Sequence, residues 1–172
     1  CGVIRVDGWD ELGDLLLAFL NLPLRSVHKL GIITPSGAAG ITTMDACERY
    51  NIEVAKLSSK TVEKMQSLVP KWQVMGNPVD MLLAGLTSPG GWRQAYLTLL
   101  EILLKDDNVD GVLCINTPYH VKGELDRVSE IAAKFPTKPV VCQTPWLFGN
   151  YISDVPLRGM PNNIAVFSIR PK

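Results

Sequence analysis

The sequence alternates short apolar runs with amphipathic segments, and this rhythm limits the possible folds more than any other feature. Helical segments, with apolar residues every three to four positions, lie between most of the runs. Strands that alternate with helices form βαβ units, whose right-handed crossovers build a parallel sheet covered by helices on both faces. The apolar runs occupy residues 29–34, 52–57, 111–119, 138–146 and 160–169.

We therefore predict an α/β fold of the flavodoxin-like, doubly wound type. The parallel sheet has about five strands, in the order 2-1-3-4-5 when the runs are numbered along the chain. Residues 1–27 come before the first sheet strand, and we expect them to form a linker made of a short strand and a helix. Residues 28–172 form the flavodoxin-like domain.

Helix signals and chain breakers refine this expectation. A helix begins at Asp7 or Gly8, with Leu12, Leu15, Leu16 and Phe19 on its apolar side. Residues 71–81 read as an irregular segment, and residues 84–91 as a loop rich in Gly and Pro. Further helices are expected over about 38–50, 58–70, 92–106 and 121–135.

Composition excludes several classes of partner. Lys and Arg together number 17, as do Asp and Glu, and no basic stripe is present, so nucleic acid is not an expected partner. The longest apolar runs are too short to span a bilayer, and no signal-peptide pattern opens the chain. We expect a cytoplasmic location without membrane association. The four cysteines show no C-x-x-C spacing, and with two histidines they predict no metal site.

The segment "TPSGAAG", residues 34–40, is the first candidate site. It joins a buried strand to a helix, as in many phosphate-binding turns, and small residues would let a ligand approach the backbone. The alternative is a turn of small residues that only packs the helix on the strand, and the local pattern does not choose between the two. The candidate phosphate-binding residues are Ser36, Gly37, Ala38, Ala39 and Gly40.

The segment "GNPVDM", residues 76–81, is the second. Asn77 and Asp80 flank a proline and are expected to shape this loop through hydrogen bonds to backbone, either as a pocket wall beside the first turn or as a rigid corner. His28 precedes the first strand, at the wrong edge of the sheet for a ligand site. His120 lies at the right edge, but no partner at a characteristic spacing supports catalysis. We therefore predict no catalytic residue in this chain.

Four segments carry a resemblance to a known family. "GVIRVDGWDELGDLLLAF", "GIITPSGAAGITTMDACERY", "LSSKTVEKMQSLVP" and "GNPVDM" are similar, in order and spacing, to the nucleoside-diphosphate-forming acyl-CoA synthetases. That group includes ADP-forming acetyl-CoA synthetases and is related to succinyl-CoA synthetase. Family turns read Thr-Asn-Ser-Gly-Gly-x-Gly, with an aspartate early in the helix where this chain has Asp45. Pro35 and Ala38 replace the family Asn and Gly.

The resemblance implies a place within a larger enzyme. The chain resembles the second flavodoxin-like domain, without its last helix, and the family's phosphorylated histidine would lie upstream of it. The implied partners are a CoA-binding domain and a first flavodoxin-like domain of the same polypeptide. An ATP-grasp domain is also implied, either in the same chain or on another subunit. The whole enzyme would use CoA, ADP/ATP or GDP/GTP, Mg²⁺ and phosphate, and the isolated chain would bind no cofactor.

The implied activity is reversible: acyl-CoA, nucleoside diphosphate and phosphate give acid, CoA and nucleoside triphosphate. The reaction would pass through an acyl phosphate and a phosphohistidine. Residues 36–40 would offer backbone donors to the phosphate, with Asn77 and Asp80 at the same edge. Two other functions stay open: a ligand-sensing regulatory domain of a protein lysine acetyltransferase, and a non-catalytic interaction scaffold.

Overall fold

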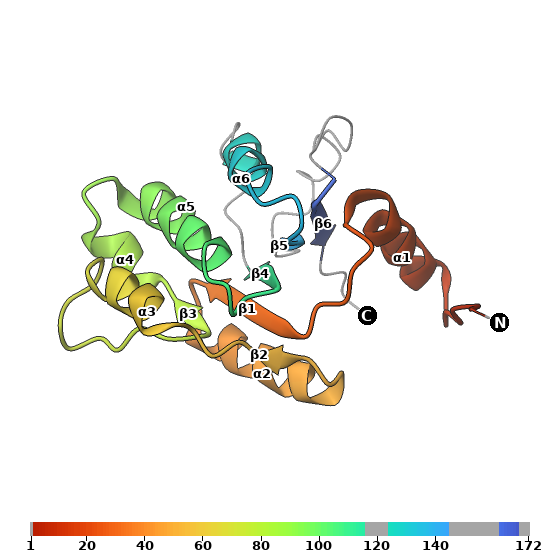
Figure 1. Cartoon of the computed structure of the whole chain (residues 1–172), viewed down its shortest axis with the longest axis horizontal. Coiled ribbons are helices and arrows are strands. Elements are labelled where there is room, and N and C mark those ends of the chain that lie inside the picture. The colour runs from red at the N-terminus through yellow and green to blue at the C-terminus, as the bar shows by residue number, and fades with distance from the viewer. Residues whose placement is uncertain (1, 116–123, 145–161, 169–172) are drawn as a thin grey trace.

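The computed structural model describes residues 2–115, 124–144 and 162–168. Its sheet strands are all parallel (Figure 1). The strands are β1 (Lys29–Thr34), β2 (Glu53–Val54), β3 (Val79–Asp80), β4 (Gly111–Ile115), β5 (Val140–Thr144) and β6 (Ile164–Ser168). The helices are α1 (Trp9–Asn21), α2 (Gly37–Arg49), α3 (Ser59–Gln66), α4 (Leu82–Thr87), α5 (Gly91–Leu104) and α6 (Glu124–Ala132).

The sheet has the strand order β2-β1-β4-β5-β6, with β3 also paired to β1. The flavodoxin-like α/β fold is therefore confirmed, since the five runs pair in the predicted order 2-1-3-4-5. The one difference is β3, which lies within the segment 71–81 that we predicted to be irregular. A two-residue strand between a proline and a helix is too short to leave a periodic signal in the sequence.

The outer edge of β1 is shared by two short strands. β2 pairs with Lys29 and Leu30, β3 pairs with Ile33 and Thr34, and β4 covers the opposite edge of β1. The predicted strand over 52–57 is thus reduced to two residues. The chain leaves the edge of β1 soon after Ala55, whose amide still donates to the Leu30 carbonyl at 2.9 Å. The second half of this edge is then free for β3.

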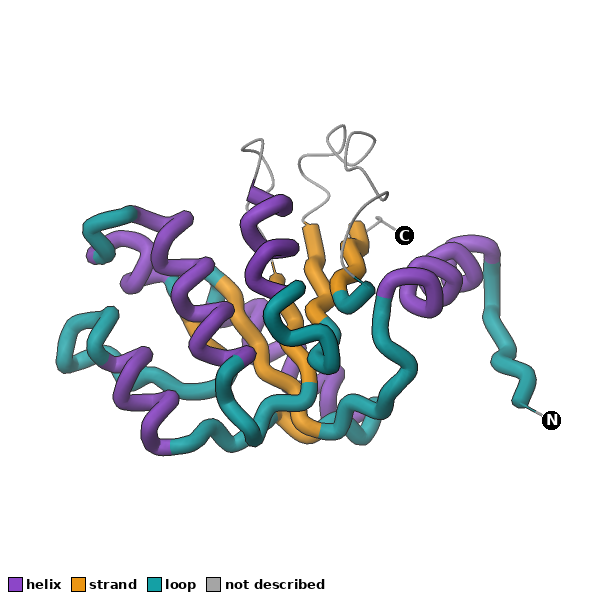
Figure 2. The backbone as a smooth tube through the Cα atoms, turned by 45° about the horizontal axis from the view of Figure 1, so that its top comes forward, coloured by secondary structure: helices purple, strands orange, loops and turns teal. Residues whose placement is uncertain are grey.

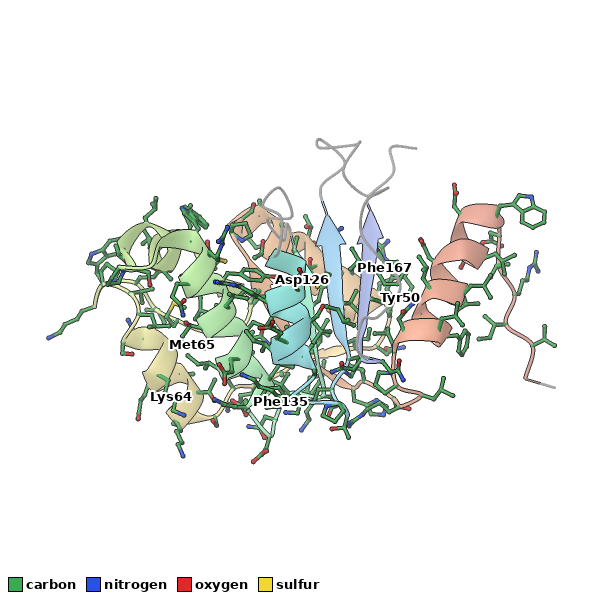
Figure 3. The ribbon with its side chains drawn as sticks, turned by 90° about the horizontal axis from the view of Figure 1, so that it is seen from above. Tyr50, Lys64, Met65, Asp126, Phe135 and Phe167 are labelled. Atoms are coloured by element: carbon green, nitrogen blue, oxygen red, sulfur yellow. The ribbon has the colours of Figure 1, made fainter. Side chains whose placement is uncertain are left out.

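Two apolar clusters hold the layers together. The larger lies between the sheet and helices α3, α5 and α6, and includes Ile33, Met65 and the leucines of α5. Figure 3 shows Met65 on α3 beside α5. The smaller cluster lies under α2 and is formed around Ile32, Cys47 and Ile115. Figure 1 shows α5 and α6 on one side of the sheet and α2 on the other. Alternate side chains of β1 and β4 therefore pack against the helices on opposite faces of the sheet, as in a doubly wound sheet.

Two further parts of the chain differ from the sequence-based expectation. Residues 84–91 were expected to form a loop, but α4 occupies Leu82–Thr87. The ring of Trp92 packs over Gly85 so closely that a Cβ there would lie 2.4 Å from the Trp92 Cδ2 atom. Tertiary contact with α5 thus stabilises a helix too short to be stable by propensity.

The N-terminal segment is the other difference. Helix α1 forms as expected, but residues 2–8 are not a strand, because they have no partner among the described strands. Helix α1 contacts β6 at the side of the sheet (Figures 1 and 2). None of its residues is buried, so its apolar side does not join either of the two clusters.

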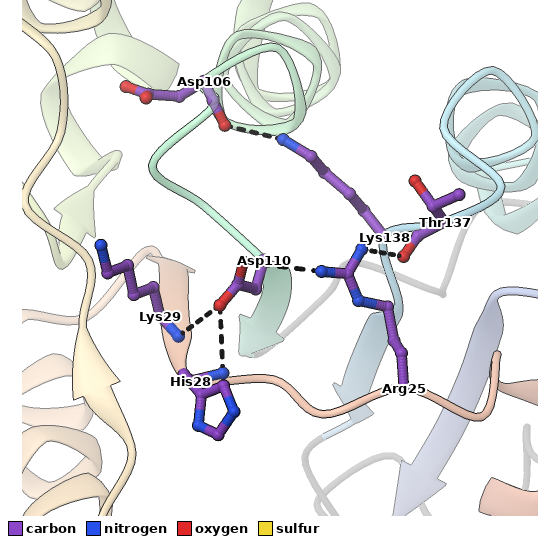
Figure 4. Close-up of polar contacts among 7 residues, drawn as sticks. All are labelled: Arg25, His28, Lys29, Asp106, Asp110, Thr137 and Lys138. Atoms are coloured by element: carbon purple, nitrogen blue, oxygen red, sulfur yellow. Dashed lines mark hydrogen bonds and ion pairs between the residues drawn. The ribbon is translucent and has the colours of Figure 1, made fainter.

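The linker between α1 and β1 is fastened to the amino-terminal edge of the sheet (Figure 4). Arg25 forms an ion pair with Asp110 (Nη2 to Oδ1, 3.6 Å) and donates to the Thr137 carbonyl at 2.9 Å. The other Asp110 oxygen accepts the amides of His28 and Lys29 at 3.1 and 2.9 Å. Burial would raise the pKa of Asp110, but these amides and the Arg25 charge outweigh it and lower the pKa.

Candidate functional site

The candidate site lies where β1 ends and α2 begins, at the carboxyl edge of the sheet. Ser36 is the N-cap of α2: its backbone is extended and its Oγ accepts the Ala39 amide at 3.4 Å. The Thr34 hydroxyl accepts the Ser36 amide at 3.1 Å, which fixes the turn between strand and helix. Thr34 is fully buried and so holds the turn from within. Ligands of open α/β sheets bind at this edge.

The first turn of α2 leaves backbone donors without acceptors. The first helical hydrogen bond runs from the Gly40 amide to the Ser36 carbonyl at 3.0 Å. The amides of Gly37 and Ala38 precede that bond, and no acceptor for them is found in the described parts of the chain. Both residues are exposed. Two N–H groups and the positive end of the helix dipole are therefore available to an anion.

Glycines let the turn approach the segment 76–81. A Cβ on Gly40 would lie 3.2 Å from the Cβ of Pro78 and 3.5 Å from the Thr34 Cγ2 atom. A Cβ on Gly37 would lie 3.1 Å from the Asp80 Oδ2 atom. The two segments singled out in the sequence are thus adjacent in the structure, and Gly37 and Gly40 are the points of closest approach.

Asp80 places a carboxylate beside the first turn of α2. It pairs with Thr34 in the sheet, and its Oδ1 accepts the Leu82 amide at 3.0 Å, where α4 begins. Its second oxygen faces Gly37. A carboxylate at a helix N-terminus interacts favourably with the helix dipole, and it opposes a second anion at the same place. Asp80 therefore opposes the binding of a free anion at this turn.

Asn77 acts on strand β1 rather than on its own loop. Its Oδ1 accepts the Ile32 amide at 2.9 Å, and its Nδ2 donates to the carbonyls of Leu30 and Ala55 at 2.8 and 2.9 Å. The side-chain amide thus fills the gap between β2 and β3 on the edge of β1, with the same donor and acceptor types as a peptide group. It fixes the strand that leads into the candidate site. The sequence indicated hydrogen bonding by Asn77 but not these distant partners.

The remaining candidates lie elsewhere. His28 is at the amino edge, where its backbone amide binds Asp110. His120 lies outside the described residues. Burial raises the pKa of the Cys114 thiol, and contact with Cys142 raises it further, so Cys114 is not an activated nucleophile. Within ranges 2–115, 124–144 and 162–168, no three His, Cys, Asp or Glu residues converge as metal ligands.

No helix in the described part of the chain combines the length and the apolar character needed to cross a bilayer.

The chain is similar to curated ADP-forming acid–CoA ligases. It is 36% identical over 117 residues to acetate–CoA ligase [ADP-forming] I of Archaeoglobus fulgidus, which covers 68% of this chain and 16% of the relative. It is 32% identical over 139 residues to the alpha subunit of acetate–CoA ligase [ADP-forming] II of Pyrococcus furiosus, covering 76% of this chain and 29% of that subunit. The 4-hydroxybutyrate–CoA ligase [ADP-forming] of Nitrosopumilus maritimus is 30% identical over 139 residues, covering 80% and 18%. No protein-family model matches the chain.

Solved structures show the same architecture. PH0766 from Pyrococcus horikoshii superposes with a TM-score of 0.70 and 26% identity, over 96% of this chain and 38% of that one. An acetyl-coenzyme A synthetase of Ca. Korarchaeum cryptofilum, solved with phosphate and ADP, superposes with a TM-score of 0.62 over 84% of this chain and 31% of that one. At 21% identity, this second likeness concerns the fold alone.

The chain spans less than a third of the length of each curated relative named above. Its motifs, its fold and these relatives place the chain in the family of nucleoside-diphosphate-forming acyl-CoA synthetases.

Proposed function

We propose that the chain is one domain of an NDP-forming acyl-CoA synthetase and that its α2 N-terminus binds the phosphoryl group in transfer. The observation that carries this proposal is the pair of exposed amides at Gly37 and Ala38, without acceptors in the described residues. The three curated relatives named above are ADP-forming ligases. The acid, CoA and the nucleoside diphosphate would bind mainly to the larger part of the enzyme that this chain does not span.

The reaction divides into three balanced steps. Phosphate attacks the thioester carbonyl of acyl-CoA, giving acyl phosphate and releasing CoA. A histidine from another part of the enzyme then takes the phosphoryl group, releasing the carboxylate. Finally the phosphoryl group passes from that histidine to the nucleoside diphosphate. In the second and third steps, which transfer the phosphoryl group, fixed N–H dipoles stabilise the charge on its equatorial oxygens.

Several residues of this chain have supporting roles in the proposal. Ser36 and Thr34 fix the direction of the donors, and Gly37 lets the phosphate oxygens approach the backbone without a side chain between. Asp80 makes the site a poor trap for phosphate, as a site that must pass the group onward requires. Since no three candidate metal ligands converge in the described residues, we derive no step through Mg²⁺ held by this chain.

The setting of the proposed enzyme is cytoplasmic. Cys47, Cys114 and Cys142, the cysteines within the described residues, form no disulfide, which fits a reducing compartment.

A single proline substitution tests the proposal. Ala38→Pro removes one of the two donors at a position in the first helical turn where proline is tolerated. In the full-length polypeptide that carries this chain, we expect phosphate-dependent formation of nucleoside triphosphate from acetyl-CoA to fall about a hundredfold, as when one oxyanion donor is removed. Lys60→Pro is the matched control. It removes an equivalent first-turn amide of α3, for which the described residues also show no acceptor, and it should leave activity unchanged.

Two results would contradict the proposal. Equal activity of the Ala38→Pro and Lys60→Pro variants would remove the phosphate role from α2. A full-length polypeptide with no acyl-CoA-dependent formation of ATP or GTP would refute the synthetase assignment, and would favour the sensor or scaffold alternatives.

A further inference from the structure

Helix α1 carries an apolar face that the described residues leave uncovered. We define this face as Trp9, Leu16, Phe19 and Leu20, whose side chains are 88%, 53%, 51% and 75% exposed. Their spacing of 7, 10 and 11 residues from Trp9 puts them on one side of a helix with 3.6 residues per turn. Single exposed apolar residues are ordinary, but four on one side of one helix are a grouping of the kind that marks an interaction site.

The opposite side of α1 is suited to water. Asp10, Glu11 and Asp14 lie there, and the helix contains no Lys or Arg. This charge pattern argues against a lipid surface as the occupant, because helices that lie on anionic membranes carry basic residues beside their apolar side. It also fixes the orientation of the helix, since the acidic side must stay solvated when the apolar face is covered.

The size of the face argues against a second copy of the chain. A helix of 13 residues is about 20 Å long, and pairing it with its copy covers less area than the roughly 1,200–2,000 Å² of stable interfaces. The linker after α1 is held at the amino edge of the sheet by Arg25, so α1 cannot easily swing to bury its face on its own domain.

The relatives indicate where a cover would come from. The superposition on PH0766 takes in 96% of this chain, so it leaves too few residues unmatched to omit α1. That match uses only 38% of the PH0766 chain, and the Archaeoglobus fulgidus ligase extends far beyond its matched 16%. The alignment with PH0766 thus includes residues of α1, and most of the PH0766 polypeptide lies outside the matched part.

We propose that the apolar face of α1 docks into an apolar groove of the neighbouring domain in the same synthetase polypeptide. This inference rests on the proposed function for the existence of that domain, but not on any catalytic step. Docking there fixes the whole flavodoxin-like body, and with it the α2 N-terminus, relative to the domains that bind the acid and CoA. Helix α1 is then a joint between domains rather than a passive linker.

Hydrogen exchange of the α1 amides tests the proposal. The experiment compares the 172-residue chain with the full-length polypeptide that carries it. We expect amides of residues 9–21 to exchange at least about tenfold more slowly in the full-length protein, because a covered helix opens less often. Equal exchange in the two proteins would overturn the proposal. Protection in the 172-residue chain that rises with its concentration would also overturn it, in favour of a second copy.

Paired substitutions locate the covered face. Leu16→Gln with Phe19→Gln should abolish the additional protection in the full-length protein. Asp14→Gln, on the opposite side of the same helix, should keep it. Since neither Leu16 nor Phe19 is buried in the chain, the double variant should fold with an unchanged Tm in the 172-residue form. If both variants keep the protection, the apolar face is not the docked surface.

The outcome is separable from the fate of the proposed function. A full-length protein that protects α1 but forms no nucleoside triphosphate would retain the docking proposal and refute the synthetase activity. A full-length protein that forms nucleoside triphosphate but does not protect α1 would support the synthetase activity and refute the docking proposal.

Discussion

Asn77 is the residue on which the edge of β1 depends most. Its side chain satisfies the Ile32 amide and the carbonyls of Leu30 and Ala55. Removing it takes the partner of the Ile32 amide and of the Ala55 carbonyl in a partly buried place, while the Leu30 carbonyl keeps the Ala55 amide. An unsatisfied buried group destabilises by about 1–3 kcal/mol.

We expect Asn77→Ala to lower the free energy of unfolding by about 2–4 kcal/mol. Urea denaturation of the 172-residue chain measures it. Asn108→Ala is the control, because the Asn108 side chain is exposed and makes one bond, to the Lys56 carbonyl at 3.1 Å. A loss for Asn77→Ala no larger than for Asn108→Ala would mean that the side-chain amide does not support the strand.

Asp106 gives the fold a dependence on pH. It is a buried carboxylate that accepts the amides of Ser58 and Asn108 at 2.8 and 2.9 Å. Burial alone would raise the pKa of Asp106, but hydrogen bonds from Asn108, Thr61 and Ser58 together lower it below its ordinary value of 3.8. A pKa lower in the folded state means that the charged form stabilises the fold above pH 3.8 and that this stability is lost as pH falls through the folded pKa.

Asp106→Asn should therefore lower the free energy of unfolding by about 1–3 kcal/mol at about pH 7. In urea denaturation, the variant should unfold at a lower urea concentration than the unmodified chain. The difference should shrink as the pH is lowered below 3.8. Asp107→Asn, at the exposed neighbouring position, should change stability by less than about 0.5 kcal/mol at either pH. A constant difference for Asp106→Asn across this pH range would show that its charge is not what the fold uses.

At the residue scale, prediction from sequence succeeds where partners are local. Ser36 accepts the amide of Ala39, three residues further along the chain, and this N-cap pattern can be recognised in the sequence. Asn77 binds backbone 45 and 47 residues away, in Ile32 and Leu30, and no local rule reports such partners. The contact of Asp80 with Gly37 likewise depends on how two strands align. Whether the five residues 36–40 bind phosphate stays a prediction.

At the scale of elements, one short helix and one short strand contribute to the surroundings of the site. Helix α4 has six residues and β3 has two, and both follow Pro78. Gly85 in the middle of α4 reads as a breaker, yet it is what allows α4 to pack against Trp92 of α5. Periodicity detects long elements such as α5, whereas these short ones exist because tertiary contacts hold them.

Two glycine substitutions should therefore act in opposite directions. Gly85→Ala places a Cβ 2.4 Å from the Trp92 ring and should destabilise the chain by about 1–3 kcal/mol in urea denaturation. Gly13→Ala, inside α1 with nothing within 4 Å of its Cβ, should strengthen that helix by about 0.5–1 kcal/mol. Slower hydrogen exchange of α1 measures the second effect. A neutral Gly85→Ala variant would show that α4 and α5 are not tightly packed.

At the scale of the whole molecule, the order of the sheet was predictable and the surroundings of α1 were not. Five apolar runs separated by helices leave few topologies, and the right-handed crossover rule selects among them. The helical period of α1 was also legible. The sequence indicated its apolar side but not that Leu16 and Phe19 are about half exposed. A periodic pattern says that a face will be covered, not whether the cover belongs to the same domain.

Strand β1 has a consequence for synthesis on the ribosome. All three strands that pair with it, β2, β3 and β4, are encoded downstream of it, and so is Asn77. As translation proceeds, β1 emerges first and cannot be paired on both edges until Ile115 has left the exit tunnel. For that interval the nascent chain exposes an apolar strand with at least one open edge, the state in which chains aggregate or recruit chaperones. Of the strands that pair with β1, β4 is made last, and its arrival therefore ends this exposure.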